Sequence, residues 1–282
     1  MKRADLLDAL DVIERTALFS DTVDWAAVRG DAETVPDAHA FLTTVLKQAG
    51  GRHSHLTPPG PPRSLPPKVV AALGPPLPTG ELIETVGYLR LPRLSGGLRR
   101  ARDYVRTGGR VLDGLVAAHP SAWIVDLRAN TGGNMWPMLA VAATLLPDGV
   151  LGHFGLPDGS YLVWSLNRGR LRLDGKRMAR SHSPAHQGGD VPIAVLVSRH
   201  TASAGEAVAV AFAGLPTVRL IGAPTAGFTT GNSTHVLRDG TRLHISGSYY
   251  ADRDRRRIDG PVPVDINADA ALDAALSWIS EV

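Results

Sequence analysis

Apolar residues recur at helical spacing in two segments near the N-terminus. The first segment is 4–19, and the second is DAHAFLTTVLKQAG at 37–50, which ends on a glycine. A period of three to four residues is typical of an amphipathic helix, and glycine commonly follows its last turn. The pattern therefore predicts a small helical unit at the start of the chain.

A proline-rich segment follows this unit. HLTPPGPPRSLPPK, residues 55–68, contains six prolines in 14 residues. Proline lacks the backbone N–H and is poorly tolerated in helix interiors and central strands, so we expect a stiff, extended crossing segment. The predicted organisation is a helical unit with its crossing segment at 1–64 and a larger domain at 65–282.

From about residue 81 the pattern changes to short apolar runs that alternate with helical segments. Strands are expected at 82–92, 121–127, 153–157, 161–166, 170–175, 193–197, 218–224, 234–240 and 241–250, and helices at 97–119, 135–147, from Ser203 onward, and at 267–279 with Asn267 as its cap. Strands alternating with helices favour an α/β core with parallel pairing, here joined by some antiparallel hairpins.

Composition narrows the class of protein. The chain has 282 residues, of which 44% are hydrophobic and 20% charged, which is ordinary for a globular protein. The net charge is only +3 and acidic residues are scattered among the basic ones, which argues against a nucleic-acid partner. Cysteine is absent, so disulfides, thiolate metal ligands and a cysteine nucleophile are excluded.

The N-terminal sequence favours a cytoplasmic location. Acidic residues interrupt MKRADLLDALDVIERTALF, where a signal peptide would have an unbroken apolar core. No stretch approaches the length of a transmembrane helix, so no membrane partner is expected. No residue pattern nominates a metal site or any other cofactor.

Two strand–loop–helix junctions carry the candidate chemistry. IVDLRANTGGNMWPML at 124–139 has Gly132 and Gly133 in its loop, and IAVLVSRHTASAGEAVAVA at 193–211 places Ser203 at a helix start. Loops at the carboxyl ends of parallel strands line the ligand crevice of α/β sheets, and exposed N–H groups there can hold an oxyanion. The alternatives are an ordinary glycine turn and an ordinary capping box between Ser203 and Glu206.

The pairing of VDLRANTGG with VLVSRHTASAGE resembles the S41 peptidase family, the tail-specific or C-terminal-processing proteases. VGYLRLPRL, GAPTAGFTTGN and RRIDGPVPVDI resemble further segments of that family, in the same order, so that the likeness runs from about 81 to 267. The resemblance implies a ClpP/crotonase-like mixed β-sheet core with flanking helices. It also implies that Ser203 is the nucleophile and that Gly132, Gly133 and the N–H of Ala204 form the oxyanion hole.

Two departures from the tail-specific proteases refine this interpretation. Those enzymes use a Ser–Lys dyad, but Phe228 stands where the lysine would be, and no lysine follows Ser203. The proline-rich segment also leaves no room for their PDZ domain. The chain is therefore more similar to the branches without the lysine, the tricorn core protease and the nisin-resistance proteins.

A serine hydroxyl needs a neighbouring base, and histidine is the usual one because its pKa lies near neutrality. GGRHSHL offers His53 and His55. The lysine-free branches carry a histidine in a G-x-H-S stretch, which favours His53. His55 would point the other way in an extended segment. Asp259 matches an acidic residue of the tricorn branch and is either a third member of a Ser-His-Asp site or part of an ordinary DG turn.

These features predict a serine peptidase that acts through an acyl-enzyme on a peptide bound in extended form. A modified or natural-product peptide is one substrate considered. A histidine base predicts that activity falls below about pH 6 to 7. The alternatives are an S41-fold acyl hydrolase or cyclase of a biosynthetic pathway, and a ligand-binding relative without proteolytic activity.

Overall fold

The computed structural model describes residues 2–60, 76–182 and 191–282, and the chain divides into two compact units. The first unit contains Met1–Ser64, Phe154–Tyr161 and Thr230–Tyr250. The second unit contains Leu65–His153, Leu162–Thr229 and Ala251–Val282. The predicted crossing segment at 55–68 lies largely outside the described residues, since only its first six positions are placed.

Helices form the first layer of the first unit. They are α1 (Arg3–Thr16), η1 (Ser20–Thr22), α2 (Trp25–Asp31) and α3 (Ala38–Gly50). Aspartate side chains cap two of them, because Asp24 accepts from Ala27 N and Asp37 accepts from His39 N and Ala40 N. The two predicted helices are confirmed, whereas the sequence analysis did not identify α2.

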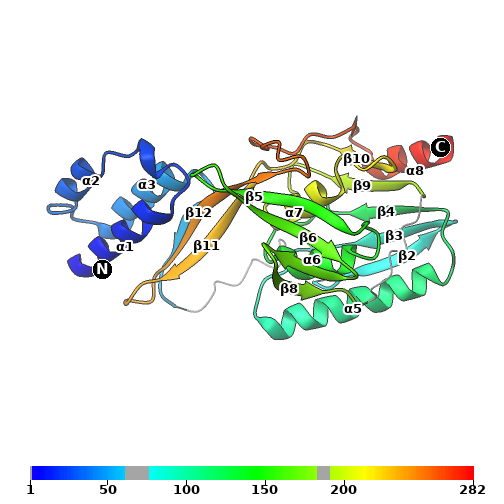
Figure 1. Cartoon of the computed structure of the whole chain (residues 1–282), viewed down its shortest axis with the longest axis horizontal. Coiled ribbons are helices and arrows are strands. Elements are labelled where there is room, and N and C mark those ends of the chain that lie inside the picture. Colours follow the sequence, from blue (N-terminus) through cyan, green and yellow to red (C-terminus); the bar gives the residue numbers. More distant parts are fainter. Residues whose placement is uncertain (1, 61–75, 183–190) are drawn as a thin grey trace. The chain divides into compact units, whose positions relative to one another are not determined.

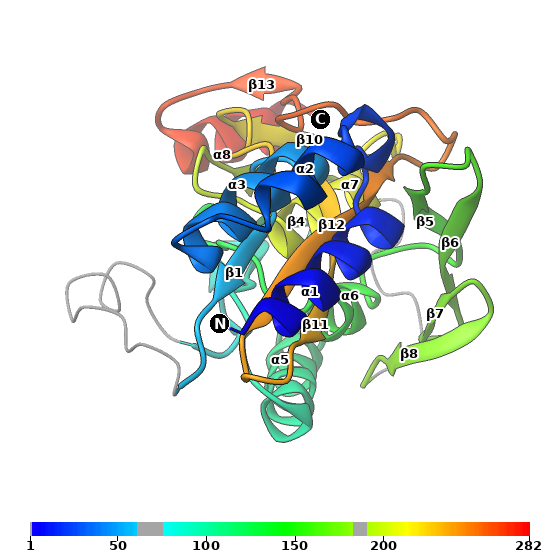
Figure 2. The same cartoon turned by 90° about the vertical axis from the view of Figure 1, so that its left-hand side faces the viewer.

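An antiparallel ladder forms the second layer of the first unit. Strand β12 (Arg242–Ala251) pairs with β1 (His55–Thr57) on one side and with β11 (Thr230–Val236) on the other. The helices cover this ladder in Figure 2, and apolar residues of α1 and α3 share a buried core with Leu243 and Ile245 of β12. The ladder brings residues 55–57 beside a segment almost 190 positions later in the sequence.

A six-stranded sheet forms the centre of the second unit, in the order β13-β10-β9-β4-β3-β2. Its strands are β2 (Thr79–Ile83), β3 (Val86–Arg90), β4 (Ala122–Asp126), β9 (Ile193–Val197), β10 (Val218–Gly222) and β13 (Ile266–Asn267). All neighbouring pairs are parallel except β2 with β3. The predicted α/β class is confirmed.

Two details of the second unit differ from the predictions. The single strand expected at 82–92 is the second half of a β2–β3 hairpin, because the chain turns at Glu84, where φ is 54°. Asn267 was expected to cap the last helix, but it belongs to β13, and Ala270 is the N-cap. A turn at a non-glycine residue with positive φ leaves little trace in the hydrophobic pattern.

Helices cover both faces of this sheet (Figure 1). On one face, α8 (Ala271–Glu281) contributes Ala271 and Ala275 to a core with residues of β3, β4, β9 and β10. On the other face lies α5 (Leu98–Val116), since a Cβ added to Gly80 of β2 would meet Val111 and Leu115. Helices α6 (Met135–Ala142) and α7 (Ala204–Phe212) complete that layer.

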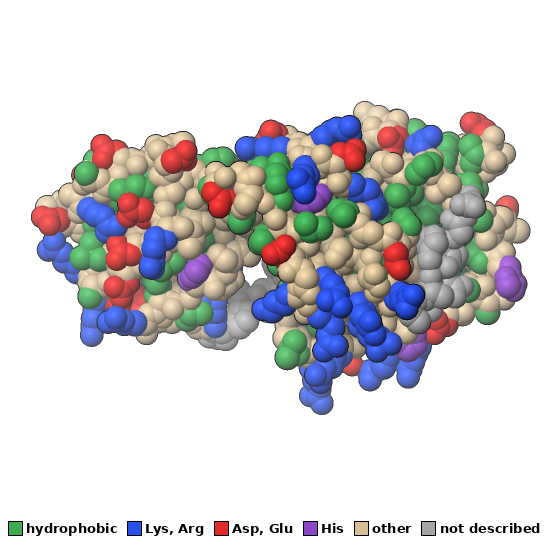
Figure 3. All heavy atoms as spheres, in the orientation of Figure 1, with side chains coloured by type: hydrophobic (Ala, Val, Ile, Leu, Met, Phe, Trp, Pro, Cys, Tyr) green, Lys and Arg blue, Asp and Glu red, His purple; other side chains and the backbone are tan. Residues whose placement is uncertain are grey.

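Four further strands run in the order β5-β6-β7-β8. They are β5 (Gly149–Gly155), β6 (Tyr161–Asn167), β7 (Arg170–Leu173) and β8 (Lys176–Arg180). Strands β7 and β8 place Arg170 opposite Arg180, and Figure 3 shows Lys and Arg side chains gathered over this region. Like charges in opposite positions destabilise a ladder, so the apolar pair of Leu171 with Ala179 must help to hold β7 and β8 together.

Among the residues described, none of the helices combines the length and the hydrophobicity that crossing a bilayer requires.

Candidate active site

The two predicted junctions lie at the same edge of the six-stranded sheet. Strands β4 and β9 are parallel neighbours, and Asp126 at the end of β4 is in register with Leu196 of β9. The loops that follow them, 127–134 and 198–203, therefore leave adjacent strand ends, where α/β sheets bind ligands. A backbone hydrogen bond from Ala202 N to Asn130 O, 2.9 Å long, joins the two loops directly.

Ser203 has an unusual backbone conformation. Its φ is 52° and its ψ is −114°, and it is the N-cap of α7. Few residues other than glycine adopt positive φ, and such strain is concentrated at functional sites, as in the serine turn of the α/β-hydrolases. The side chain of Ser203 is half-buried. The conformation presents one hydroxyl at the start of a helix, whose first N–H groups point toward the same place.

Glu206 holds this turn in place from inside the protein. It is fully buried, and its carboxylate accepts from Ser203 N at 2.6 Å, from Thr225 Oγ1 at 2.5 Å and from Gly227 N at 2.6 Å. Burial raises the pKa of Glu206, although these donors act in the opposite direction. One carboxylate thus connects the serine turn to the segment 225–228, which ends at Phe228.

Gly132 lies in contact with the serine turn. Its φ is 99°, and a Cβ at this position would lie 2.9 Å from Ser203 Cβ and 3.0 Å from Ala202 O. Gly133 is also required to be glycine, since its φ is 118° and an added Cβ would lie 1.8 Å from Leu94 O. Both glycines therefore permit a close approach of backbone segments in addition to a turn.

Of the three predicted oxyanion donors, Gly132 is already engaged. Its N–H donates to Asn130 Oδ1 at 3.0 Å. Within the described parts of the chain, no hydrogen bond is assigned to the N–H of Gly133 or to that of Ala204, the first residue of α7. The N–H groups of Gly133 and Ala204 are the two that could donate to an oxyanion, and this role stays a prediction.

Asn130 is a residue whose part in the site the sequence analysis missed. Its side chain is 1% exposed, and its Nδ2 donates to Leu91 O at 2.9 Å while its Oδ1 receives Gly132 N. Its own carbonyl receives Ala202 N. Asn130 therefore fixes the glycine loop and the serine loop together, and the only signal in the sequence was its place within DLRANTGG.

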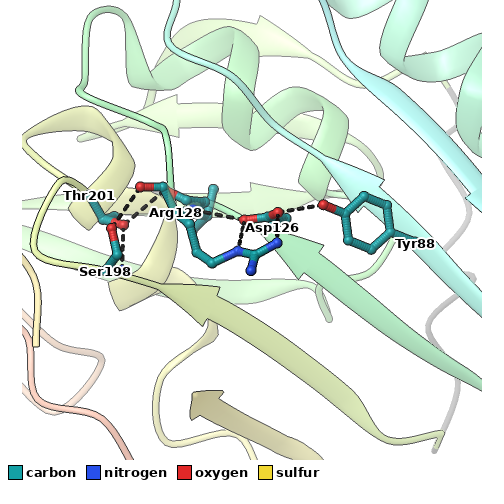
Figure 4. A network of polar contacts seen from close by, with 6 residues as sticks. Tyr88, Asp126, Arg128, Ser198 and Thr201 are labelled. Atoms are coloured by element: carbon teal, nitrogen blue, oxygen red, sulfur yellow. Dashed lines mark hydrogen bonds and ion pairs between the residues drawn. The ribbon is translucent and has the colours of Figure 1, made fainter. Parts of the chain in front are cut away.

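A network of five further hydrogen bonds stiffens the same loops (Figure 4). Asp126 accepts two hydrogen bonds from the Arg128 guanidinium, at 3.0 and 2.7 Å, and one from the Tyr88 hydroxyl. Burial opposes ionisation of Asp126, but Arg128 and Tyr88 outweigh it and lower the pKa of that carboxyl. Ser198 Oγ donates to Arg128 O at 2.7 Å, and Thr201 Oγ1 donates to Leu127 O at 2.8 Å.

The two candidate histidines of the first unit have different surroundings. His53 Nδ1 lies 2.7 Å from Thr230 Oγ1, and burial lowers the pKa of His53 to about 4, with the neighbouring charges of His55 and Arg52 acting in the same direction. His55 lies in β1, is exposed, and stacks on His244 with 4.4 Å between ring centroids. His55 Nδ1 also lies 3.1 Å from the backbone carbonyl of His53, so both rings have partners, and His53 is the more buried of the two.

Asp259 belongs to the second unit and lies at its surface. Its side chain is 72% exposed, and its carboxylate forms an ion pair with Arg257 at 2.6 Å. The roles of His53 as base and of Asp259 as a third member remain predictions, since the structure describes each residue within its own unit.

Replacing Gly132 by alanine tests the fit between the two loops. The new Cβ would collide with Ser203 Cβ and require an alanine at a φ of 99°. We expect kcat/KM to fall about 100-fold if Ser203 is the reacting group, because displacements near 1 Å at such a group cost that much. Unfolding free energy should fall by about 1–3 kcal/mol. Steady-state kinetics and thermal denaturation measure both.

Gly114→Ala is the matched control for this substitution. Gly114 lies within α5, and a Cβ there meets nothing within 4 Å. Alanine favours the helix by about 0.5–1 kcal/mol over glycine, so this variant should be fully active and no less stable. Full activity in Gly132→Ala would show that the contact with Ser203 is irrelevant to the chemistry.

Comparisons with known proteins agree with the sequence motifs. The model of "Peptidase family S41" matches residues 85–268. The nisin-resistance protein of Lactococcus lactis subsp. lactis is 29% identical over 285 residues, which cover 96% of this chain and 85% of that protein. A lipoprotein structure from Streptococcus agalactiae superposes with a TM-score of 0.79 at 25% identity, covering 99% of this chain and 96% of that one.

A third likeness concerns the fold alone. The photosystem II D1 C-terminal processing protease superposes with a TM-score of 0.61 at 14% identity, covering 95% of this chain and 93% of that chain. Together with the sheet order, it confirms the predicted ClpP/crotonase-like core with flanking helices and an N-terminal helical unit.

Proposed function

The chain belongs to peptidase family S41, a family of serine-type peptidases, and from this we propose that it hydrolyses peptide bonds with Ser203 as its nucleophile. The observation that carries this assignment is the backbone of Ser203, which is held at a φ of 52° with Gly132 packed against it. A serine that only capped a helix would adopt the extended backbone typical of N-caps and would not require this strain.

The proposed reaction has two half-reactions. Ser203 Oγ attacks the carbonyl carbon of the scissile peptide bond while its proton passes to Nε2 of His53, and the N–H groups of Gly133 and Ala204 donate to the oxyanion. His53 then gives this proton to the leaving amine as the C–N bond breaks, which leaves an acyl-enzyme on Ser203. Water, deprotonated by His53, attacks the ester and restores the serine.

A modified peptide of the natural-product kind is the substrate class we propose. The support is the likeness to a nisin-resistance protein at 29% identity along most of both chains. An extended peptide could be recognised mainly through its main chain, as in strand addition. A cytoplasmic location belongs to the same proposal and is tested by fractionation of cells that make the protein.

The activity should persist to lower pH than an ordinary histidine base would allow. His53 has its pKa lowered to about 4, so it is unprotonated, and competent as a base, through the neutral and mildly acidic range. We expect kcat/KM to be constant near neutrality and to fall as pH drops through about 4. The ordinary histidine value would place this fall near 6.5.

A pH–rate profile, with fluorescence recorded at each pH to monitor folding, makes this measurement. A loss of activity centred near pH 6.5 in the folded protein would contradict the lowered pKa. A rate that keeps rising through pH 9 to 10 would count against His53 as the base.

Mass spectrometry of peptides incubated with the purified protein tests the function itself. The mixture should contain unmodified peptides and nisin, and Ser203→Ala and His53→Ala should be run beside the wild-type protein. Cleavage by the wild type that is lost in both variants is the expected result. Identical, uncut mixtures from all three proteins would refute peptide hydrolysis. That result would favour acyl transfer, cyclisation or ligand binding.

A further inference from the structure

Four hydrogen bonds form a closed ring around His53 in the first unit. His53 Nδ1 lies 2.7 Å from Thr230 Oγ1, which lies 3.1 Å from Ser246 Oγ. Ser246 Oγ donates to Asn232 Oδ1 at 2.8 Å, and Asn232 Nδ2 donates to the backbone carbonyl of His53 at 3.2 Å. The ring thus begins at the imidazole of His53 and returns to its main chain.

The donor and the acceptor of each hydrogen bond in this ring follow from one group, the backbone carbonyl of His53, which can only accept. A backbone carbonyl has no proton, so the Asn232 amide must turn its NH₂ toward His53 O and its Oδ1 toward Ser246. Ser246 has one hydroxyl proton, and the 2.8 Å contact with Asn232 Oδ1 uses it. Ser246 Oγ must therefore accept at its other contact.

Assigning one proton to each hydroxyl in the same way also determines the protonation of the imidazole. Because Ser246 Oγ accepts, the single proton of Thr230 is donated to it, and Thr230 Oγ1 accepts from its remaining partner. That partner is His53 Nδ1, which must carry a proton. Neutral imidazole has one N–H, so Nε2 then bears the lone pair. This is the tautomer that a base acting through Nε2 requires.

The surrounding fold fixes the ring geometrically. Ser246 is fully buried, and its N–H donates to Ser54 Oγ, which in turn donates to Gly50 O at the end of α3. The β11–β12 register shifts between Gly231 and Asn232, so that Asn232 pairs with Ser246. The helix end, both strands and the residue after His53 therefore all contribute to one arrangement.

The ring is neutral apart from the imidazole. A carboxylate beside a histidine raises its pKa, whereas hydroxyl and amide groups add no charge. Burial lowers the pKa of His53, and no carboxylate in the ring opposes this effect. Asp259, the acid that the sequence nominated, forms an ion pair with Arg257 at the surface of the second unit, and its role as a third member stays a prediction.

We propose that Thr230, Ser246 and Asn232 are positioning residues that hold His53 in its Nδ1–H tautomer, the task performed by the acid in Ser-His-Asp sites. This inference rests on the proposed function for its catalytic meaning, since it assumes that His53 is the base. The tautomer itself is a property of the folded chain and can be observed without any substrate.

The test is a nitrogen NMR spectrum of the whole protein labelled with ¹⁵N-histidine, recorded near pH 7.5. His53→Gln identifies the signals of His53 among those of the ten histidines. We expect Nδ1 to carry the proton in wild type. Thr230→Val, which removes the acceptor at nearly constant volume, should change the tautomer ratio and lower kcat about 10- to 100-fold with little change in KM, since a wrong tautomer disables a histidine base.

Two variants control this test. Thr230→Ser keeps the hydroxyl and should restore both the tautomer and most of the activity. Thr234→Val, on the same strand, removes a hydroxyl that contacts His244 Nδ1 at 3.0 Å and should alter neither His53 nor kcat. The wild-type spectrum and Thr230→Ser still decide the question if Thr230→Val fails to fold.

The possible results distinguish the ring's proton arrangement from the proposed peptide hydrolysis. An Nε2–H tautomer in wild type would overturn the ring, as would an unchanged spectrum and full activity in Thr230→Val. An Nδ1–H tautomer in a protein that cleaves no peptide would support the ring and refute the proposed function.

Discussion

Replacing Ser203 by alanine should lower peptide cleavage by about 10⁴-fold or more, because removing the nucleophile of a serine protease removes nearly all of its chemistry. The substitution leaves the architecture of the turn in place. Glu206 accepts from the backbone N–H of Ser203 and not from its side chain, and alanine has the same Cβ at a φ of 52°. Initial rates and intact-mass spectra of wild type and variant provide the measurement.

Stability must be measured in parallel, since a lost N-cap hydroxyl costs about 0.5–2 kcal/mol on its own. Ser198→Ala is the matched control in the same loop. Its hydroxyl donates to Arg128 O and is not predicted to react, so this variant should keep activity within about tenfold while losing a similar amount of stability. Retention of activity by Ser203→Ala would show that Ser203 is not the nucleophile.

The sequence predicted the sheet junctions well because they depend on local pattern. An apolar run, a loop and a helix start occupy 16 consecutive residues in one junction and 19 in the other, and β4 and β9 then place the two loops together. The division into units could not be read in the same way. Thr230–Tyr250 joins Met1–Ser64 through pairing across about 190 positions, which no local period records.

The candidate site shows the same contrast. Ser203 and Gly132 belong to short motifs, so their resemblance to known proteases was visible in the sequence. The partners that orient them were not visible. Glu206 appeared only as half of a capping box, although it is buried and also binds Thr225 and Gly227. Thr230 lies 177 positions from His53, and hydrogen bonds between such distant residues exist only once the chain has folded.

His53→Gln and His55→Gln should differ sharply in activity. Glutamine can donate to Thr230 as the imidazole does, but it cannot take a proton at neutral pH, so His53→Gln should lower kcat/KM by about 10²- to 10⁴-fold. His55→Gln removes an exposed ring that stacks on His244, and its kcat/KM should stay within about threefold of wild type, as for most surface substitutions. Matched initial-rate measurements at pH 7.5 compare the two.

Comparing His53→Gln with His55→Gln also distinguishes the loss of a catalytic base from a defect in folding. Both residues flank Ser54, whose hydroxyl joins Gly50 to Ser246, so a general disturbance of this segment should affect the two variants alike. A large loss confined to His53→Gln, with both variants equally stable, supports a base oriented by Thr230. A larger loss of kcat/KM in His55→Gln would identify His55 of β1 as the base, and the ring around His53 would then have a structural role only.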